Sequence, residues 1–166
     1  MARVLGTTLI TDAVRDHIWA RRSSELVTIG LKVVDEGEFQ IPAPDQLASR
    51  LPQVVVQYRK ASPITRKKSQ SAFQATHHLT VNFLRLLGDT EPKNVTVRQQ
   101  AELIANLFLQ GTFQLPGYTP SALTKVLIEE CSATALELEE GFLFEDLAEI
   151  EHASIPLEIT ATHYDV

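Results

Sequence analysis

Apolar residues near the start of the chain recur at helical spacing. In the segment TTLITDAVRDHIWARRS they fall three and four positions apart, at Leu9, Ile10, Ala13, Val14 and Ile18. This spacing places them on one face of a helix. Thr7 or Thr8 can cap the start of this helix, and Arg21 and Arg22 complement the helix dipole at its end. Trp19 flanks the apolar stripe and belongs either to the core or to a contact surface.

The segment TVRQQAELIANLFLQG predicts a second helix. Thr96 followed by Gln99 fits a capping box, and Gly111 is a C-terminal stop signal. The apolar stripe of this helix consists of Val97, Ala101, Ile104, Ala105 and Phe108.

Alternation of apolar and polar residues predicts three strands before the second helix. These strands are LVTIGLKVV (26–34), QVVVQYRK (53–60) and HHLTVNFLRLL (77–87). The proline-rich segment 35–52 connects the first two, with one helical turn expected around Asp45 to Ser49. The polar, basic segment 61–75 reads as a long loop, so the second and third strands form an extended hairpin with a projecting tip.

The chain ends on a further strand, ASIPLEITATHYDV. Ile155, Leu157, Ile159 and Ala161 share one face of it. Ala148 and Ile150 have the opposite parity, which predicts a bulge near residues 152–154. Such a terminal strand is either an integral member of the sheet or an edge that offers its backbone to a neighbouring chain.

The order of these elements predicts one α+β domain spanning residues 1–166. We expect a mostly antiparallel sheet with two main helices packed on one face and a long projecting β-hairpin loop. A chain of 166 residues with 44% apolar residues can bury a core of its own. It contains no apolar run of the ~20 residues that a membrane helix requires, so we expect a soluble protein with no membrane partner.

Charge is distributed unevenly along the chain. Residues 1–125 carry all 15 Lys and Arg against 10 acids, whereas residues 126–166 carry 11 acids and no Lys or Arg. The split is either a pair of solvated faces or the property of a subunit whose positive edge meets a neighbour's negative edge in a ring.

The sequence contains little that indicates catalysis. It has no glycine-rich phosphate loop and no nucleophile elbow. The adjacent His77 and His78 would point to opposite faces of a strand, so they do not make a metal pair. An enzyme using His77, His78 or His152 is therefore the weakest of three functional hypotheses, and we expect no catalytic residue, no metal and no cofactor.

Two charged groups are candidate contact surfaces. The first is a candidate interface with a subunit or a tube. It consists of the basic residues Arg59, Lys60, Arg66, Lys67 and Lys68 and the aromatic Phe73. The second is an acidic surface that would bind the basic group of another copy. It is formed by Glu137, Glu139, Glu140, Glu149 and Glu151. The basic 59–68 loop also allows an alternative function, that of a nucleic-acid-binding accessory protein.

Three segments give the chain a resemblance to the tail-terminator and neck (head-to-tail joining) proteins of tailed bacteriophages. They are the opening helix TTLITDAVRDHIWARR, the strand LPQVVVQYRK paired through a long loop with HHLTVNFLRLL, and the helix VRQQAELIANLFL followed by strands that close on ASIPLEITATHYDV. Residues 112–130 depart from the pattern because they are longer than expected at that place.

The resemblance implies a structural virion protein, not an enzyme. A subunit of that family forms a ring that caps the tail tube, stops its polymerisation and presents a docking surface to the head. The implied partners are other copies of the chain in a ring, expected to be a hexamer, the tail tube, the sheath and the neck or connector protein. DNA would pass through the ring without sequence-specific binding. The implied location is the virion tail or neck, with the host cytoplasm during assembly.

Overall fold

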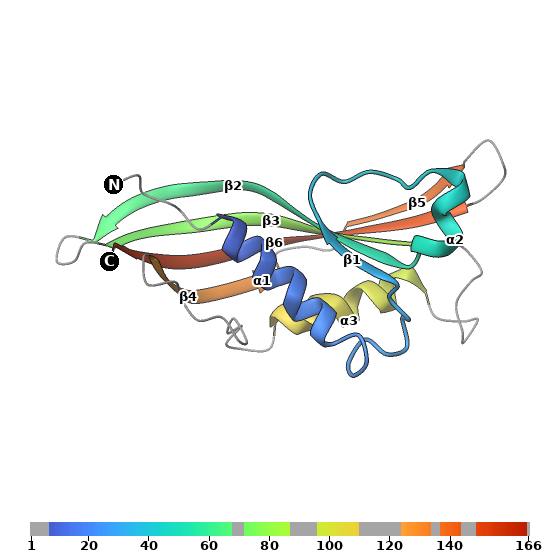
Figure 1. Ribbon diagram of the computed structural model, residues 1–166, viewed down its shortest axis with the longest axis horizontal. Helices are drawn as coiled ribbons and strands as arrows, with labels where there is room; N and C mark the ends of the chain where they lie inside the picture. Colours follow the sequence, from blue (N-terminus) through green and yellow to red (C-terminus); the bar gives the residue numbers. More distant parts are fainter. Residues whose placement is uncertain are drawn as a thin grey trace.

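The structure is a computed structural model that describes residues 7–67, 72–86, 96–109, 124–133, 137–143 and 149–165. One mixed sheet and several helices make up this part of the chain, which confirms the α+β class (Figure 1). The helices are α1 (Thr7–Ala20), the short 3-10 helix η1 (Pro44–Gln46), α2 (Leu47–Arg50) and α3 (Val97–Leu109). The strands are β1 (Val33–Glu36), β2 (Gln53–Lys67), β3 (Ala72–Leu86), β4 (Thr124–Ala133), β5 (Glu137–Leu143) and β6 (Glu149–Asp165).

The strand order is β1-β2-β3-β6-β4, and β5 also pairs with β6. Among the described strand pairs only β1–β2 is parallel; the other pairs are antiparallel. Strand β4 pairs with residues 157–165 of β6 and β5 with residues 149–154, so β4 and β5 follow one another along the same side of β6. Strand β6 is therefore a central strand with neighbours on both sides. Of the two possibilities that its sequence allowed, it is an integral member of the sheet and not an edge.

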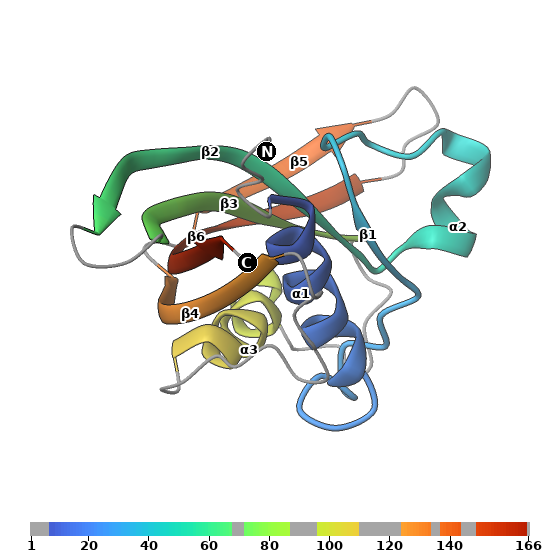
Figure 2. The same ribbon diagram turned by 60° about the vertical axis from the view of Figure 1, so that its left-hand side comes forward.

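The main core lies between one face of the sheet and two helices. Side chains of α1 and α3 belong to one apolar cluster with the same face of β2, β3 and β6. Figure 2 shows the two helices next to one another beside the sheet. The cluster includes fully buried Val14, Phe83, Ile104, Ile155 and Leu157.

A second, smaller cluster lies on the opposite face of the sheet. The connection after β1 covers this face, so that Leu47 and Leu51 pack on Leu84 and Ile150. The bulge predicted near residues 152–154 is wrong, because β6 pairs with β3 without a register shift from Ile150 to Tyr164. The change of parity arises because Ile150 is buried on the face opposite Ile155.

The predicted strand at 26–34 is also wrong over most of its length. Residues 21–29 form turns, in which the Leu26 N–H donates to the Arg21 carbonyl at 3.0 Å. Gly30 has a φ of +68°, which interrupts an extended conformation. Leu26, Ile29 and Leu31 are buried in the core without strand pairing, and β1 begins only at Val33. The helical turn expected around Asp45 to Ser49 is confirmed by η1 and α2.

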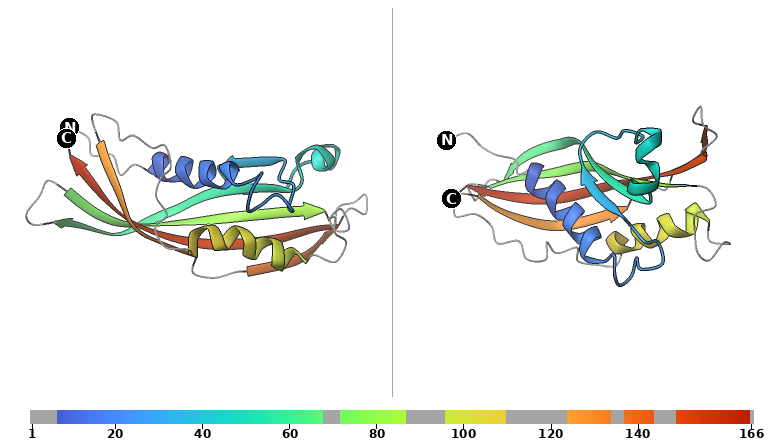
Figure 3. Two further views of the ribbon diagram at one scale, coloured as in Figure 1. Left: turned by 90° about the horizontal axis from the view of Figure 1, so that it is seen from below. Right: turned by 45° about the vertical axis from the view of Figure 1, so that its right-hand side comes forward.

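The segment predicted as a loop at 61–75 is mostly sheet. Strand β2 continues to Lys67 and β3 begins at Ala72, with irregular register between Ala61 and Ile64. Serine and basic residues are compatible with this strand because pairing with β3 satisfies its backbone groups. The ends of β2, β3, β6 and β4 extend beyond α1 and α3, as both panels of Figure 3 show.

Both long helices follow the local signals in the sequence. At α3 the Thr96 N–H donates to Gln99 Oε1 at 2.9 Å and the Gln99 N–H donates to Thr96 Oγ1 at 3.2 Å, which confirms the capping box. Beyond the end of α1, the Arg22 guanidinium donates to the Trp19 carbonyl at 2.8 Å and lies over the indole ring. Trp19 is 40% exposed, so it lies at the surface and not in the core. None of the described helices is long and apolar enough to span a bilayer.

Candidate functional site

The described sheet leaves two long edges without a strand neighbour. Strand β2 pairs with β1 only from Gln53 to Val56, so its outer side from Gln57 to Lys67 has no strand partner in the described part of the chain. On the other side of the sheet, β4 and β5 pair only with β6 within the same described ranges. Unpaired backbone groups on an edge strand can pair with another chain. The two edges are therefore the candidate site for contact with a partner.

Four of the basic candidate residues lie on the edge strand β2. Arg59 and Lys60 are exposed, and Arg59 Nε donates to Thr80 Oγ1 at 3.2 Å. Arg66 and Lys67 are the last two residues of β2, and Arg66 is opposite Phe73 of β3 in the register. Lys68 lies outside the described residues. The structure thus places Arg59, Lys60, Arg66 and Lys67 on one strand, whereas the sequence predicted a loop for Arg66 and Lys67.

Three of the five acidic candidates lie on β5, on the side of the sheet opposite β2. Glu137, Glu139 and Glu140 belong to β5, and Glu149 is the first residue of β6, opposite Leu143.

Glu151 does not belong to that acidic surface. Its side chain is only 12% exposed, and it forms an ion pair with Arg85, which is 5% exposed. Arg85 also donates to Gln100 Oε1 of α3 at 3.0 Å. This position of Glu151 corrects its assignment from the sequence, because a carboxylate enclosed with its own cation offers no charge to a partner.

An open pocket of about 480 Å³ lies between the first turns of α1, the end of β1 and β2. Glu36 lines it, and Arg15 of α1 contacts the Glu36 carboxylate at 3.4 Å. Burial and the neighbouring Asp12 carboxyl raise the pKa of Glu36 to about 7, although Arg15 acts in the opposite direction. The pocket is lined by Thr7, Thr8, Thr11, Glu36, Gly37, Glu38, Gln57 and Tyr58.

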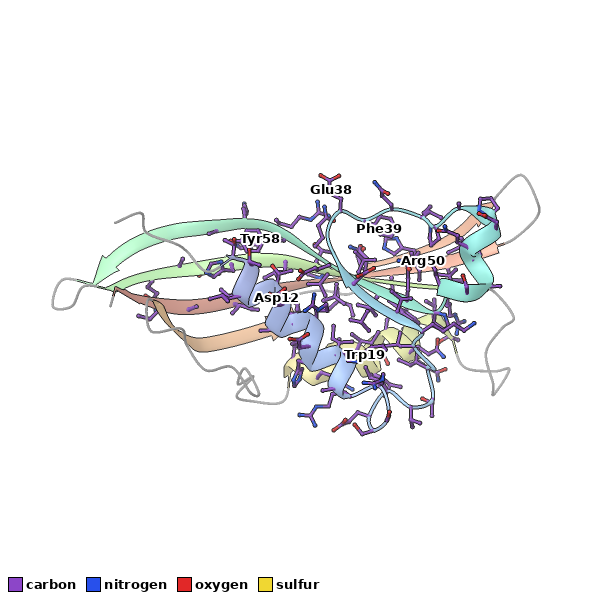
Figure 4. All side chains as sticks on the ribbon, in the orientation of Figure 1. Asp12, Trp19, Glu38, Phe39, Arg50 and Tyr58 are labelled. Carbon is purple, nitrogen blue, oxygen red and sulfur yellow. The ribbon has the colours of Figure 1, made fainter. Side chains whose placement is uncertain are left out.

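Tyr58 connects this pocket with the core. Figure 4 shows it beside the N-terminal half of α1, whereas Trp19 lies at the other end of that helix. The Tyr58 hydroxyl forms a 2.7 Å hydrogen bond with Nδ1 of the fully buried His77. Burial raises the pKa of the Tyr58 phenol. His78 lies on the opposite face of β3, 3.6 Å from Glu158, as the alternation of the strand predicts.

A polar cluster of His152, Asn82 and Ser154 lies on the reverse face of the sheet. His152 Nε2 is 3.0 Å from Asn82 Oδ1 and 3.2 Å from Ser154 Oγ, and the His152 ring stacks on Phe39. In a catalytic Ser–His–Asp triad the serine and the acid contact different ring nitrogens. Here the amide and the hydroxyl converge on the same nitrogen of a side chain that is 5% exposed, so these three residues are not arranged as such a triad.

Sequence reasoning missed this cluster and the Glu36–Asp12 pair. The register of β3 with β6 places Asn82 opposite Ser154, next to His152, whereas the packing of α1 on β1 brings Asp12 to Glu36. Among the described residues no group of three His, Cys, Asp or Glu side chains is arranged to hold a metal ion.

No protein-family model matches the chain, and no curated protein matches it significantly. The case for a function therefore rests on the residues and geometry of the chain itself.

Proposed function

We propose that this chain is the ring-forming tail terminator of a bacteriophage tail, a structural protein that caps the tail tube and joins it to the neck. The single observation that carries the proposal is the pair of long sheet edges, β2 and β4–β5, left open in the described residues. A ring subunit needs two different contact surfaces, one for each neighbour. Two opposite edges of one sheet supply them.

The strand ends support the same function. The β2–β3 hairpin and the adjoining ends of β6 and β4 extend past the helical layer. An extension of this kind is suited to reach a neighbouring subunit or the last ring of a tube. The proposal needs no catalytic group, since a cap acts by occupying the end of the tube. The proposed partners are other copies of the chain, the tube and sheath proteins and the neck protein.

Negative-stain electron microscopy of the concentrated protein, alone and with isolated tail tubes, tests the proposal. Rings in solution, or caps on tube ends, support it and give the symmetry. Caps formed by a protein that is monomeric in solution support it as well, because the tube then templates the ring. A protein that remains monomeric and ignores tubes refutes it.

The alternative function, nucleic-acid binding, is favoured by one observation: Arg59 and Lys60 are exposed on the basic β2 strand. Phosphate contacts make such binding strongly dependent on salt. This function predicts that the purified protein binds DNA or RNA at low salt, and that replacing Arg66, Lys67 and Lys68 with Ala abolishes binding. The formal net charge of −6 disfavours it.

A further inference from the structure

We infer that two copies of this chain associate through different edges, the β2 edge of one copy pairing antiparallel with the β4–β5 edge of the next. The inference rests on the proposed ring and identifies the surfaces that close it.

The two edges carry opposite charge. Strand β2 contains four basic residues and no acid. Strands β4 and β5 together contain one lysine and five glutamates, Glu129, Glu130, Glu137, Glu139 and Glu140. Charged residues on an edge strand usually protect it from pairing, because a second copy of the same edge repels it. In this chain, two β2 edges from different copies repel each other, and so do two β4–β5 edges. The β2 edge of one copy attracts the β4–β5 edge of another, because their charges are opposite.

The direction of the contact follows from the topology. Strand β2 is antiparallel to β3, β3 to β6 and β6 to β4, so β4 runs antiparallel to β2 within one sheet. Copies that follow one another without being inverted therefore place β2 antiparallel to the next copy's β4–β5. The open part of β2, Gln57 to Lys67, offers about 36 Å of edge at ~3.3 Å per residue. A contact between two different edges is heterologous, and it closes into a ring when the rotation between copies divides a full turn.

The charges also indicate a stagger between copies. Lys67 lies level with Lys125 in the sheet, since Lys67 pairs with Ala72, Ala72 with Tyr164, and Tyr164 with Lys125. Copies related without a shift along the strands would place these two lysines side by side. A shift of about four residues, roughly 13 Å, removes this repulsion.

With that shift the basic and acidic residues coincide. Lys67 then lies opposite Glu130 of the next copy, with Glu129 in the adjacent bulge of β4 and Arg66 next to Lys67 on β2. Arg59 lies level with Glu137 and Leu138 at the start of β5. The stagger is consistent with strands that are inclined to the ring axis, as in closed sheets generally.

Two charge-reversed variants test the pairing. The first carries Arg66→Glu and Lys67→Glu, and the second carries Glu129→Lys and Glu130→Lys. In each variant alone the changed residues meet residues of the same charge on the next copy, so we expect it to sediment as a monomer at concentrations where the wild type assembles. An equimolar mixture makes every contact favourable in an alternating ring. We therefore expect the mixture to recover assembly, to within about tenfold of the wild-type association constant.

The matched control for the first variant is Arg21→Glu with Arg98→Glu, which makes the same change in net charge at residues beyond α1 and on α3. We expect this control to assemble as the wild type does. Circular dichroism establishes that each variant is folded. If a variant does not fold, the salt dependence of the wild-type association decides: association must weaken between about 0.05 and 0.5 M NaCl, where screening shortens the range of charge interactions.

The outcomes separate the contact from the proposed function. Assembly by the wild type together with folded variants whose mixture stays monomeric overturns the edge pairing and leaves the ring standing. Association that is insensitive to salt also overturns the pairing. A wild-type protein that neither associates nor caps tubes overturns both.

Discussion

The buried ion pair between Arg85 and Glu151 gives a sharp test of the packing between α3 and the sheet. Arg85 of β3 lies opposite Glu151 of β6, and their side chains are only 5% and 12% exposed. Gln100 of α3 accepts a further hydrogen bond from Arg85 at 3.0 Å. We predict that Glu151→Ala is strongly destabilising because it leaves the guanidinium charge enclosed without its carboxylate.

The expected magnitude follows from this environment. Removing one partner of a buried ion pair costs about 3–5 kcal/mol. The retained hydrogen bond to Gln100 and the residual exposure of position 151 place this case near the lower end, at about 3 kcal/mol. In a domain of this size 1 kcal/mol corresponds to about 2–4 °C, so the melting temperature should fall by about 6–12 °C.

A double-mutant cycle measured by urea unfolding checks the reasoning. The single variants Arg85→Met and Glu151→Ala and the double variant Arg85→Met/Glu151→Ala form the cycle. The double variant removes both charges and should cost less than Glu151→Ala alone, because no unpaired charge remains inside. The exposed pair of Arg50 with Asp35, at 3.2 Å, supplies the control, and Asp35→Ala should change stability by less than about 1 kcal/mol. A cost below about 1 kcal/mol for Glu151→Ala, or additive costs in the cycle, would refute the idea of a buried, coupled pair.

Three further predictions concern local features. The pKa of Glu36 is about 7 in the fold, against an ordinary value of 4.5. Between pH 4.5 and about 7 the unfolded chain therefore binds fewer protons than the folded chain, and the free energy of unfolding should fall as pH rises through this range. Glu36→Gln should flatten that fall in thermal unfolding from pH 4 to 9 while Glu38→Gln keeps it; an unchanged slope in Glu36→Gln would contradict the raised pKa. Tyr58→Phe removes the 2.7 Å hydrogen bond to buried His77 and should lower the free energy of unfolding by about 1–3 kcal/mol, whereas a neutral result would mean that the bond contributes nothing. Thr96→Ala removes half of the capping box and should cost about 1 kcal/mol in urea unfolding, with Thr96→Ser restoring most of it; equal stability of the two variants would argue against the cap.

The sequence by itself determined the elements whose signals are local. The apolar stripes of both long helices and the capping box at Thr96 depend on residues within a few positions of one another, and the structure confirms them. The paired strands at 53–60 and 77–87 were predictable for the same reason, because alternation follows directly from the backbone geometry of a strand. The separation of positive and negative charge along the chain is likewise a property of the sequence.

The candidate site was only partly predictable. The residue types of the basic and acidic groups were identified, but their place at two opposite sheet edges depends on the strand order. Sequence patterns do not specify that order, because strand pairing joins residues that are distant in the chain. The continuation of β2 to Lys67 is a similar case, since a polar segment becomes a strand when a neighbour satisfies its backbone groups.

Tertiary structure alone decided which strand faces are buried and which charges are enclosed. Ile150 faces a second cluster because the segment after β1 covers that part of the sheet. Glu151 lies inside because Arg85, 66 residues away, is opposite it in the register. Local periodicity sets the direction of a side chain relative to its own backbone, whereas burial and charge pairing depend on which distant segment packs against it.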